Sequence, residues 1–259
     1  MDIIHSIDST EHFIGWETSN PFPYCVIDDF LNEELAHALS NEFAPYNDPL
    51  WHSYENPLED KKTTNSWNHF QPNTYRTLSF LNSPTFLNRL CQLTKINVLL
   101  ADPGLNGGGL HIHKRSGRLN PHLDYSMHPR LPYQRKLNLL IYLNPNWKES
   151  WGGHLGLFAK GTQSHHGECV KKISPKFNRA VLFDTTMQSW HGIVSPIDCP
   201  DTEYRKSLAT YYLTIPEENV DSREKALFTT TAEQANDPEI QALIKDRANA
   251  KTAAETYKK

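Results

Sequence analysis

The run KLNLLIYLN (136–144) indicates the fold of this chain, because it is short, apolar and closed by the turn signal NPNW (144–147). A run of this kind predicts a buried β-strand. Several short strands that are separated by turn clusters, with little helix between them, predict a sandwich or a barrel. Four other runs of the same type are GGLHIH (108–113), GHLGLF (153–158), AVLFD (180–184) and SLATYYLT (207–214).

The first hundred residues have a different pattern. PFPYCVIDDFL (21–31) predicts a turn, a short strand and the start of a helix. NEELAHALSNEF (32–43) and SPTFLNRLCQLTKI (83–96) carry apolar residues at helical spacing, so each predicts an amphipathic helix. Residues 45–75 are rich in Asn, Pro, Asp and Trp without a clear period, and we expect mostly loop there.

These patterns predict one domain over residues 1–259, mainly β with flanking helices. The tail turns polar and helical again after the last β-type run. We expect three parts in this domain: N-terminal helical and strand support (1–105), the β core (106–216) and a helical C-terminal tail (217–259).

Composition narrows the class of protein. The net charge of −4 comes without blocks of like charge, whereas nucleic-acid binders usually carry a basic stripe. No apolar run approaches the ~18 residues that span a bilayer, and MDIIHSIDSTEHF (1–13) lacks the pattern of a signal peptide. The four cysteines form no CxxC pair, which argues against a zinc ribbon or a disulfide framework. We expect a cytoplasmic protein with neither a nucleic-acid nor a membrane partner, and its oligomeric state is left open.

The stretch NPHLDYS (120–126) places His122 and Asp124 two residues apart. On an extended chain such side chains point to the same face. Taken alone, this pair is more often part of an ordinary surface turn. His191, in SWHG, follows a predicted strand after one short loop. Two neutral imidazoles and one carboxylate form the facial triad of non-haem iron, which leaves three coordination positions open.

An arginine follows this candidate triad at the start of the last predicted strand. Arg205 and Ser207 share one face of that strand, while Asn138 and Tyr142 share a face of the run 136–144. A buried guanidinium needs an anion, and an arginine with a nearby hydroxyl suits a carboxylate. The phenol of Tyr142 is a further donor for the same carboxylate.

The pieces SGRLNPHLD, LNLLIYLN, WGGHLGLF, SWHG and YRKSLATYY occur in an order that resembles the 2-oxoglutarate- and Fe(II)-dependent oxygenases, in their prolyl-4-hydroxylase-like branch. The resemblance covers roughly residues 20–215. It implies a double-stranded β-helix, the jelly roll of cupin-like proteins, with helices packed on one sheet. It also implies iron held by His122, Asp124 and His191.

The same resemblance implies that 2-oxoglutarate chelates the iron and that its far carboxylate meets Arg205, with Tyr142 and Ser207 nearby. In much of this branch a tyrosine stands where this chain has His113. We expect that His113 lines the co-substrate pocket, but the resemblance assigns it no specific role. The loop 125–136 is a lid on the substrate or a solvated connection. Within it, the candidate substrate contacts are Tyr125, Arg130 and Arg135.

The resemblance implies a dioxygenase that uses O2 and 2-oxoglutarate to hydroxylate an unactivated C–H bond, with release of succinate and CO2. The substrate is open: a peptidyl residue such as proline, a free amino acid, a nucleoside, a sugar or a carrier-tethered intermediate. Two alternatives stand beside this hypothesis. One is a catalytically silent jelly roll that only binds a ligand, and the other is a cupin-like dioxygenase that needs no co-substrate.

Arg205→Ala should weaken 2-oxoglutarate binding far more than iron binding, because the guanidinium is assigned to the co-substrate and not to the metal. Separate anaerobic titrations of Fe(II) and of 2-oxoglutarate measure the two affinities. Equal 2-oxoglutarate affinity in the variant and the parent would remove Arg205 from the site.

Overall fold

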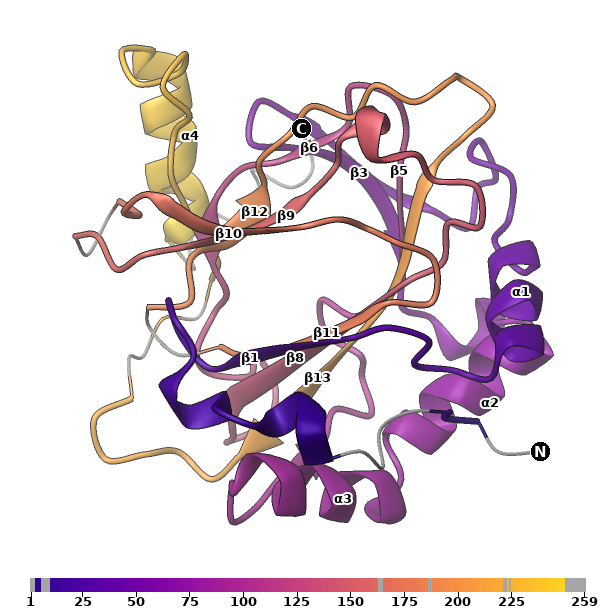
Figure 1. The fold of residues 1–259 in the computed structure, drawn as a ribbon. Coiled ribbons are helices and arrows are strands. Elements are labelled where there is room, and N and C mark those ends of the chain that lie inside the picture. The colour runs from indigo at the N-terminus through magenta and orange to yellow at the C-terminus, as the bar shows by residue number, and fades with distance from the viewer. Residues whose placement is uncertain are drawn as a thin grey trace.

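The chain folds around two antiparallel β-sheets that face each other (Figure 1). The computed structural model describes residues 3–5, 10–162, 165–185, 188–220, 223 and 225–249. The large sheet curls, so that its β3 and β5 side approaches the small sheet (Figure 1). Two facing antiparallel sheets with few helices confirm the predicted mainly-β, jelly-roll architecture.

The large sheet supplies one wall of the interior. Its strand order is β1 (Tyr24–Ile27), β11 (Ala180–Asp184), β8 (Gln134–Tyr142), β13 (Arg205–Thr214), β5 (Gly109–His113), β3 (Glu59–Thr64) and β2 (His52–Asn56), with β4 (Leu100–Ala101) on β13 and β6 (Arg118–Leu119) on β3. The central strand β8 alternates between two environments. Leu137, Leu139 and Ile141 face the helices, while Leu140 and Tyr142 face the small sheet.

The small sheet forms the opposite wall. Its order is β10 (Cys169–Ile173), β9 (Leu155–Phe158), β12 (His191–Ile193), β7 (His122–Leu123) and β14 (Leu227–Phe228). All of its pairings are antiparallel. The strands are short, and the edge strand β10 exposes Val170, Lys171 and Lys172 and buries Ile173.

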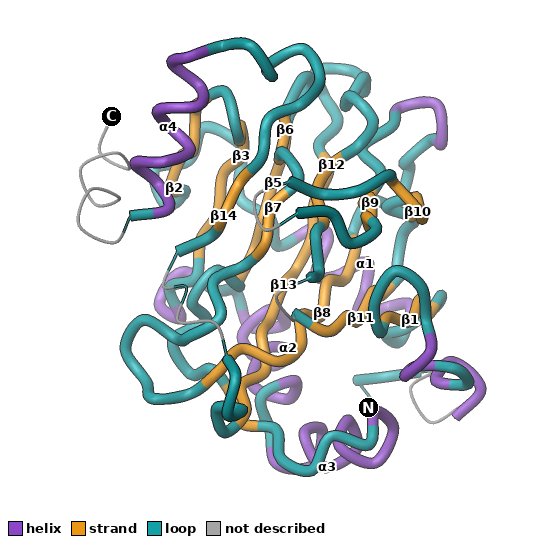
Figure 2. Tube along the Cα trace, turned by 90° about the vertical axis from the view of Figure 1, so that its left-hand side faces the viewer, coloured by secondary structure: helices purple, strands orange, loops and turns teal. Residues whose placement is uncertain are grey.

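Three helices cover the outer face of the large sheet (Figure 1). They are α1 (Glu33–Asn41), α2 (Pro72–Leu81) and α3 (Pro84–Thr94), and their apolar residues share one buried cluster with the large sheet. A fourth helix, α4 (Pro238–Ala248), packs beside β14 at the other end of the molecule (Figure 2). Short 3₁₀ turns are η1 (Thr10–Phe13), η2 (Trp16–Thr18), η3 (Trp67–His69) and η4 (Glu149–Trp151).

Most sequence expectations for regular structure are confirmed, including the two helices expected at 32–43 and 83–96. The expectation of mostly loop over 45–75 is wrong, because β2, β3 and the start of α2 lie there. The β3 sequence EDKKTT has no apolar run, and it is a strand because it pairs with β5. The tail contains α4 but also the short strand β14, and residues 250–259 lie outside the described residues.

The cysteines and the lengths of the helices bear on two further features of the chain. All four cysteines are free thiols, and no disulfide framework was expected from the sequence. Among the described residues, every helix is too short or too polar to cross a bilayer.

Asn178 ties the N-terminal segment to the β core. Its side-chain oxygen accepts from the Leu31 N–H (2.9 Å), and its amide donates to the Leu31 carbonyl (2.8 Å). Its own backbone N–H donates to the Tyr142 carbonyl (2.9 Å). The residue is buried and has a positive φ of 57°, a conformation that asparagine tolerates better than most residues.

Asn178→Ala should lower the free energy of unfolding by about 2–4 kcal/mol, because the buried Leu31 amide and carbonyl lose their partner and alanine is strained at this φ. Chemical denaturation measures the change. Asn178→Gly relieves the backbone strain and should recover about 1 kcal/mol of that loss. Parent-like stability in Asn178→Ala would show that this link does not hold the N-terminal segment.

Candidate metal centre and co-substrate pocket

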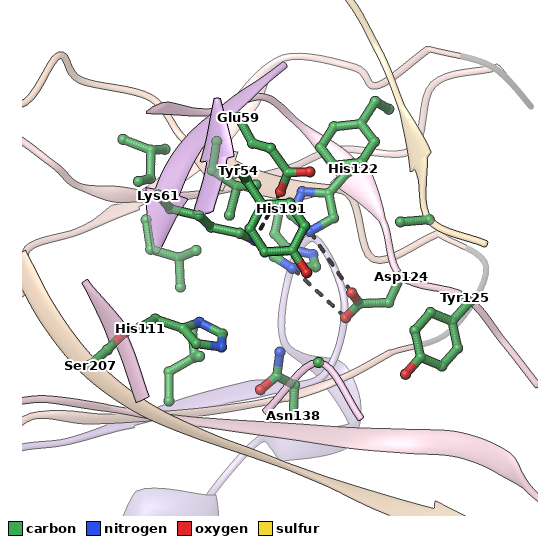
Figure 3. A pocket seen from close by; sticks show the side chains of 18 of the residues that line it. Tyr54, Glu59, Lys61, His111, His122, Asp124, Tyr125, Asn138, His191 and Ser207 are labelled. Atoms are coloured by element: carbon green, nitrogen blue, oxygen red, sulfur yellow. Dashed lines mark ion pairs between the residues drawn. The ribbon is translucent and has the colours of Figure 1, made fainter. Parts of the chain in front are cut away.

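The three candidate metal ligands meet at the small sheet. Antiparallel pairing of β12 with β7 puts His191 directly opposite His122, and Asp124 follows β7 by one residue. Their potential ligand atoms all lie within 4.8 Å of one another, and all three residues are buried. The two imidazole rings have centroids 4.3 Å apart, and each imidazole faces the Asp124 carboxylate (Figure 3). This grouping offers one ligand atom from each residue to a single metal ion.

Backbone carbonyls fix the orientation of both imidazoles. His122 Nδ1 lies 3.0 Å from the Asn120 carbonyl, and His191 Nδ1 lies 2.9 Å from the Ser189 carbonyl. Because each Nδ1 donates its proton to a carbonyl, each Nε2 is left as the metal-binding atom. Gly192 allows the close approach of the chains here, since a Cβ on it would come within 2.9 Å of the Asn120 carbonyl oxygen.

The protonation states of His122 and Asp124 suit a metal. Burial, together with the neighbouring His191, lowers the pKa of His122 to about 3. Burial raises the pKa of Asp124, but the charges of His191 and Arg135 outweigh burial and hold the pKa below its ordinary value. The neutral imidazole of His122 and the ionised carboxylate of Asp124, which are the forms that bind metals, therefore prevail around neutral pH.

A tyrosine and an arginine hold one oxygen of Asp124. The Tyr211 hydroxyl donates to Oδ1 (3.3 Å), and Arg135 Nη1 lies 3.6 Å from the same atom. The Arg135 guanidinium is stacked between the rings of Tyr125 and Tyr211, at 3.4 and 3.6 Å from their centroids. The other oxygen, Oδ2, is buried and accepts no hydrogen bond from any described residue. This orphaned oxygen fits a metal that the carboxylate would bind through one atom.

A buried arginine lines the same cavity as the triad. Arg205 is 4% exposed; its Nε donates to the Gly153 carbonyl (2.7 Å), and its Nη2 donates to the Tyr142 hydroxyl (3.4 Å). No carboxylate in the described part of the chain forms an ion pair with it. Strand register puts His113 opposite Arg205 on β5, and Ser207 also lines the cavity. A buried guanidinium without a protein anion fits the carboxylate of a bound ligand.

Two further polar groups in this cavity lack partners. Both ring nitrogens of His113 and the side-chain oxygen of Asn138 are buried without a hydrogen bond from the described residues. Both residues line the cavity, which measures about 250 Å³. The co-substrate candidates named from sequence thus lie at or beside one cavity, and that cavity has unused hydrogen-bonding capacity.

The three candidate substrate contacts lie in different places. Tyr125 and Arg135 line the cavity, although Arg135 is buried against Asp124. Arg130 is exposed and does not line the cavity. Sequence reasoning missed further lining residues. Tyr54, Glu59 and Lys61 lie on β2 and β3, where mostly loop was expected, and Phe228 and Arg247 lie in the tail, which carried no motif. His111 lies in a predicted strand but was assigned no role.

Part of this chain is similar in sequence to known proteins. Residues 108–213 match a family model described as the 2OG-Fe(II) oxygenase superfamily. A stretch of 59 residues, 23% of the chain, is 32% identical to prolyl 3-hydroxylase OGFOD1 of Xenopus laevis, and it spans only 12% of that protein.

Solved structures share the wider fold. A prolyl hydroxylase from Trichoplax adhaerens, in complex with a hypoxia inducible factor oxygen degradation domain peptide fragment, superimposes with a TM-score of 0.53 at 17% identity, over 79% of this chain and 88% of that one. A Pseudomonas putida prolyl-4-hydroxylase gives a TM-score of 0.55 at 16% identity, over 80% and 99%. At these identities the likeness establishes a common fold.

Tyr211→Phe should weaken Fe(II) binding about tenfold, since it removes the hydroxyl that orients Asp124. Anaerobic titration against a competing chelator measures the affinity. Tyr212→Phe is the matched control: its hydroxyl is buried, has no hydrogen-bond partner among the described residues and belongs to the cluster on the helix side of β13. Equal Fe(II) affinity in the two variants would show that the Tyr211 hydroxyl does not support the metal ligand.

Proposed function

We propose that this chain is an Fe(II)- and 2-oxoglutarate-dependent hydroxylase of the 2OG-Fe(II) oxygenase superfamily, whose family model its residues 108–213 match. The observation that carries the proposal is the placement of a buried His-Asp-His triad around one cavity with a buried arginine that has no carboxylate partner among the described residues. When bound, Fe(II) and 2-oxoglutarate supply the oxidation by O2 that hydroxylates a C–H bond, with succinate and CO2 as the other products.

In this proposal His122, Asp124 and His191 would hold the metal. Arg205 and the Tyr142 hydroxyl would bind the far carboxylate of 2-oxoglutarate. Both donors are fully or almost fully buried, so their bonds to a carboxylate are little weakened by water. Ser207, His113 and Asn138 are further polar groups beside the same molecule.

The remaining lining residues keep the reacting atoms in place and dry. Tyr211 and Arg135 fix one oxygen of Asp124, so that the other oxygen would remain available to the metal. Leu140, Leu155 and Ile193 line the cavity with apolar surface and limit the access of water. Orientation of the target C–H bond and exclusion of water are the contributions that we assign to this chain.

For the substrate we propose a chemical class and not a specific molecule. The similar proteins are prolyl hydroxylases by name, and one was solved with a peptide. A prolyl or other peptidyl residue is therefore one candidate substrate, beside a small or carrier-tethered molecule. Tyr125, at the cavity and stacked on Arg135, is our candidate for contact with that substrate.

Anaerobic addition of Fe(II) and then 2-oxoglutarate to the metal-free protein should produce the visible charge-transfer band of the iron chelate. His191→Ala should weaken or abolish the band, because only two protein ligands remain. His12→Ala, which changes a histidine of η1 outside the cavity, should keep it. A folded parent that takes up iron but gives no band would contradict the proposal and favour a jelly roll that only binds a ligand.

A further inference from the structure

The two candidate histidine ligands are supported by different parts of the chain. The ring of His191 packs against Phe183 of β11, with 4.8 Å between the centroids. The ring of His122 lies against Phe228 of β14, with 5.0 Å between the centroids and only 17° between the planes. β11 lies within the segment that matches the family model, whereas β14 follows that segment. One imidazole is therefore supported by the large sheet and the other by the C-terminal part of the chain.

This C-terminal part lies along β7 as a continuous segment. We call residues 227–248, which comprise β14 and α4, the strap. β14 pairs with β7 so that Phe228 lies opposite His122, and α4 lies beside β14 (Figure 2). Ile240 of α4 packs in one small buried cluster with Phe228 and Leu58. The helix thus backs the aromatic ring that lies against the candidate ligand.

Asn120 connects the strap to a second restraint on His122. The Asn120 carbonyl accepts a hydrogen bond from His122 Nδ1 (3.0 Å). The side-chain amide of the same residue donates to the Thr229 carbonyl (3.1 Å) and to Gln234 Oε1 (2.6 Å). Asn120 is buried, and its backbone N–H donates to the Leu58 carbonyl (2.8 Å). One residue therefore both orients the imidazole and holds the strap.

Gln234 completes this link from the side of the strap. Its Oε1 accepts from the Asn120 amide and from the Thr231 N–H (3.1 Å), and its Nε2 donates to the carbonyl of Pro57, in the β2–β3 turn (2.9 Å). Gln234 is half-buried, and it is not one of the described residues that line the cavity. A substitution at Gln234 therefore changes no direct contact with a metal or a ligand in that cavity.

These contacts bear on the metal because they decide how His122 presents Nε2. The Asn120 carbonyl keeps the ring hydrogen on Nδ1, and Phe228 limits rotation of the ring. Without Gln234, one hydrogen of the buried Asn120 amide would lose its acceptor, and an unpaired buried donor is costly. The segment around Asn120 would then shift toward a new acceptor and carry its carbonyl away from His122.

We propose that the strap is a positioning element of the metal centre, in which Asn120 and Gln234 are positioning residues for His122. The inference rests on the part of the proposed function that assigns a metal to the triad. It goes beyond that assignment by coupling metal affinity to the docking of the strap on β7. Because such a coupling is reciprocal, bound metal should also hold the strap more firmly.

Anaerobic titration of Fe(II) against a competing chelator measures the effect of the strap on the metal. Gln234→Ala should weaken Fe(II) binding about tenfold, as is usual for groups that orient a metal ligand. Gln234→Glu should keep most of the affinity, because a carboxylate oxygen still accepts from the Asn120 amide. Gln241→Ala is the matched control: its Nε2 donates within the strap, to the Ala235 carbonyl (2.7 Å), and its loss should leave the affinity unchanged.

Hydrogen exchange of the backbone amides of residues 227–234, with and without Fe(II), measures the effect of the metal on the strap. Fe(II) should slow this exchange in the parent and in Gln241→Ala, and slow it less in Gln234→Ala. A purely structural role of Gln234 would change the exchange of the metal-free protein but not the Fe(II) affinity. If Gln234→Ala does not fold, Phe228→Leu gives the second test, because it removes the stacked ring and should also weaken Fe(II) binding.

Two results would each overturn the inference: equal Fe(II) affinity in Gln241→Ala and the folded strap variant, or exchange of the strap in the parent that Fe(II) leaves unchanged. The charge-transfer band on addition of 2-oxoglutarate separates this inference from the proposed function. A band in the parent with either of those results would keep the hydroxylase proposal and overturn the role of the strap. A parent without the band, whose Fe(II) affinity still falls in Gln234→Ala, would support the strap and contradict the hydroxylase proposal.

Discussion

The antiparallel pairing of β12 with β7 is the constraint on which the site depends. It sets His191 opposite His122, so two ligands almost seventy positions apart in the chain are neighbours across a pair of strands. Asp124 then needs only one residue of continued chain to reach them. Both strands are very short, and their position is secured by β9 and β14 on either side. A shift of one residue in this register would turn His191 away from the cavity.

Buried charge is the second organising feature. The interior between the sheets holds carboxylates and cations that are costly to bury and are retained only where partners offset that cost. Asp124 is offset by Arg135 and the imidazoles, and Glu59 by Lys61 and Arg247. Arg205 is the exception, since no carboxylate of the described residues forms an ion pair with it and its Nη2 donates to the Tyr142 hydroxyl. The cavity is thus prepared electrostatically for ligands that are themselves anionic.

The sequence allowed the core and the triad to be predicted, because both depend on local signals. The runs that became β8, β11 and β13 are apolar and bounded by turns, and the HxD spacing is visible without a structure. The contribution of β3 and α4 to the wall of the cavity was not predictable in the same way. EDKKTT reads as a solvated stretch, and Arg247 reads as one more charge in a polar helix. Their burial arises from contacts between segments almost 190 residues apart, for which one sequence holds no signal.

The contacts that join Glu59 to Lys61 and Arg247 have a consequence for how such a protein diverges. The candidate metal ligands and Arg205 all lie within residues 108–213, whereas Glu59 and Lys61 precede that segment and Arg247 follows it. The candidate metal ligands and these three lining residues therefore come from separate stretches of the chain that meet only after folding. Mutations in β3 or α4 can change the wall of the cavity while the candidate metal ligands stay in place. The shape and charge of the cavity can thus diverge independently of the triad.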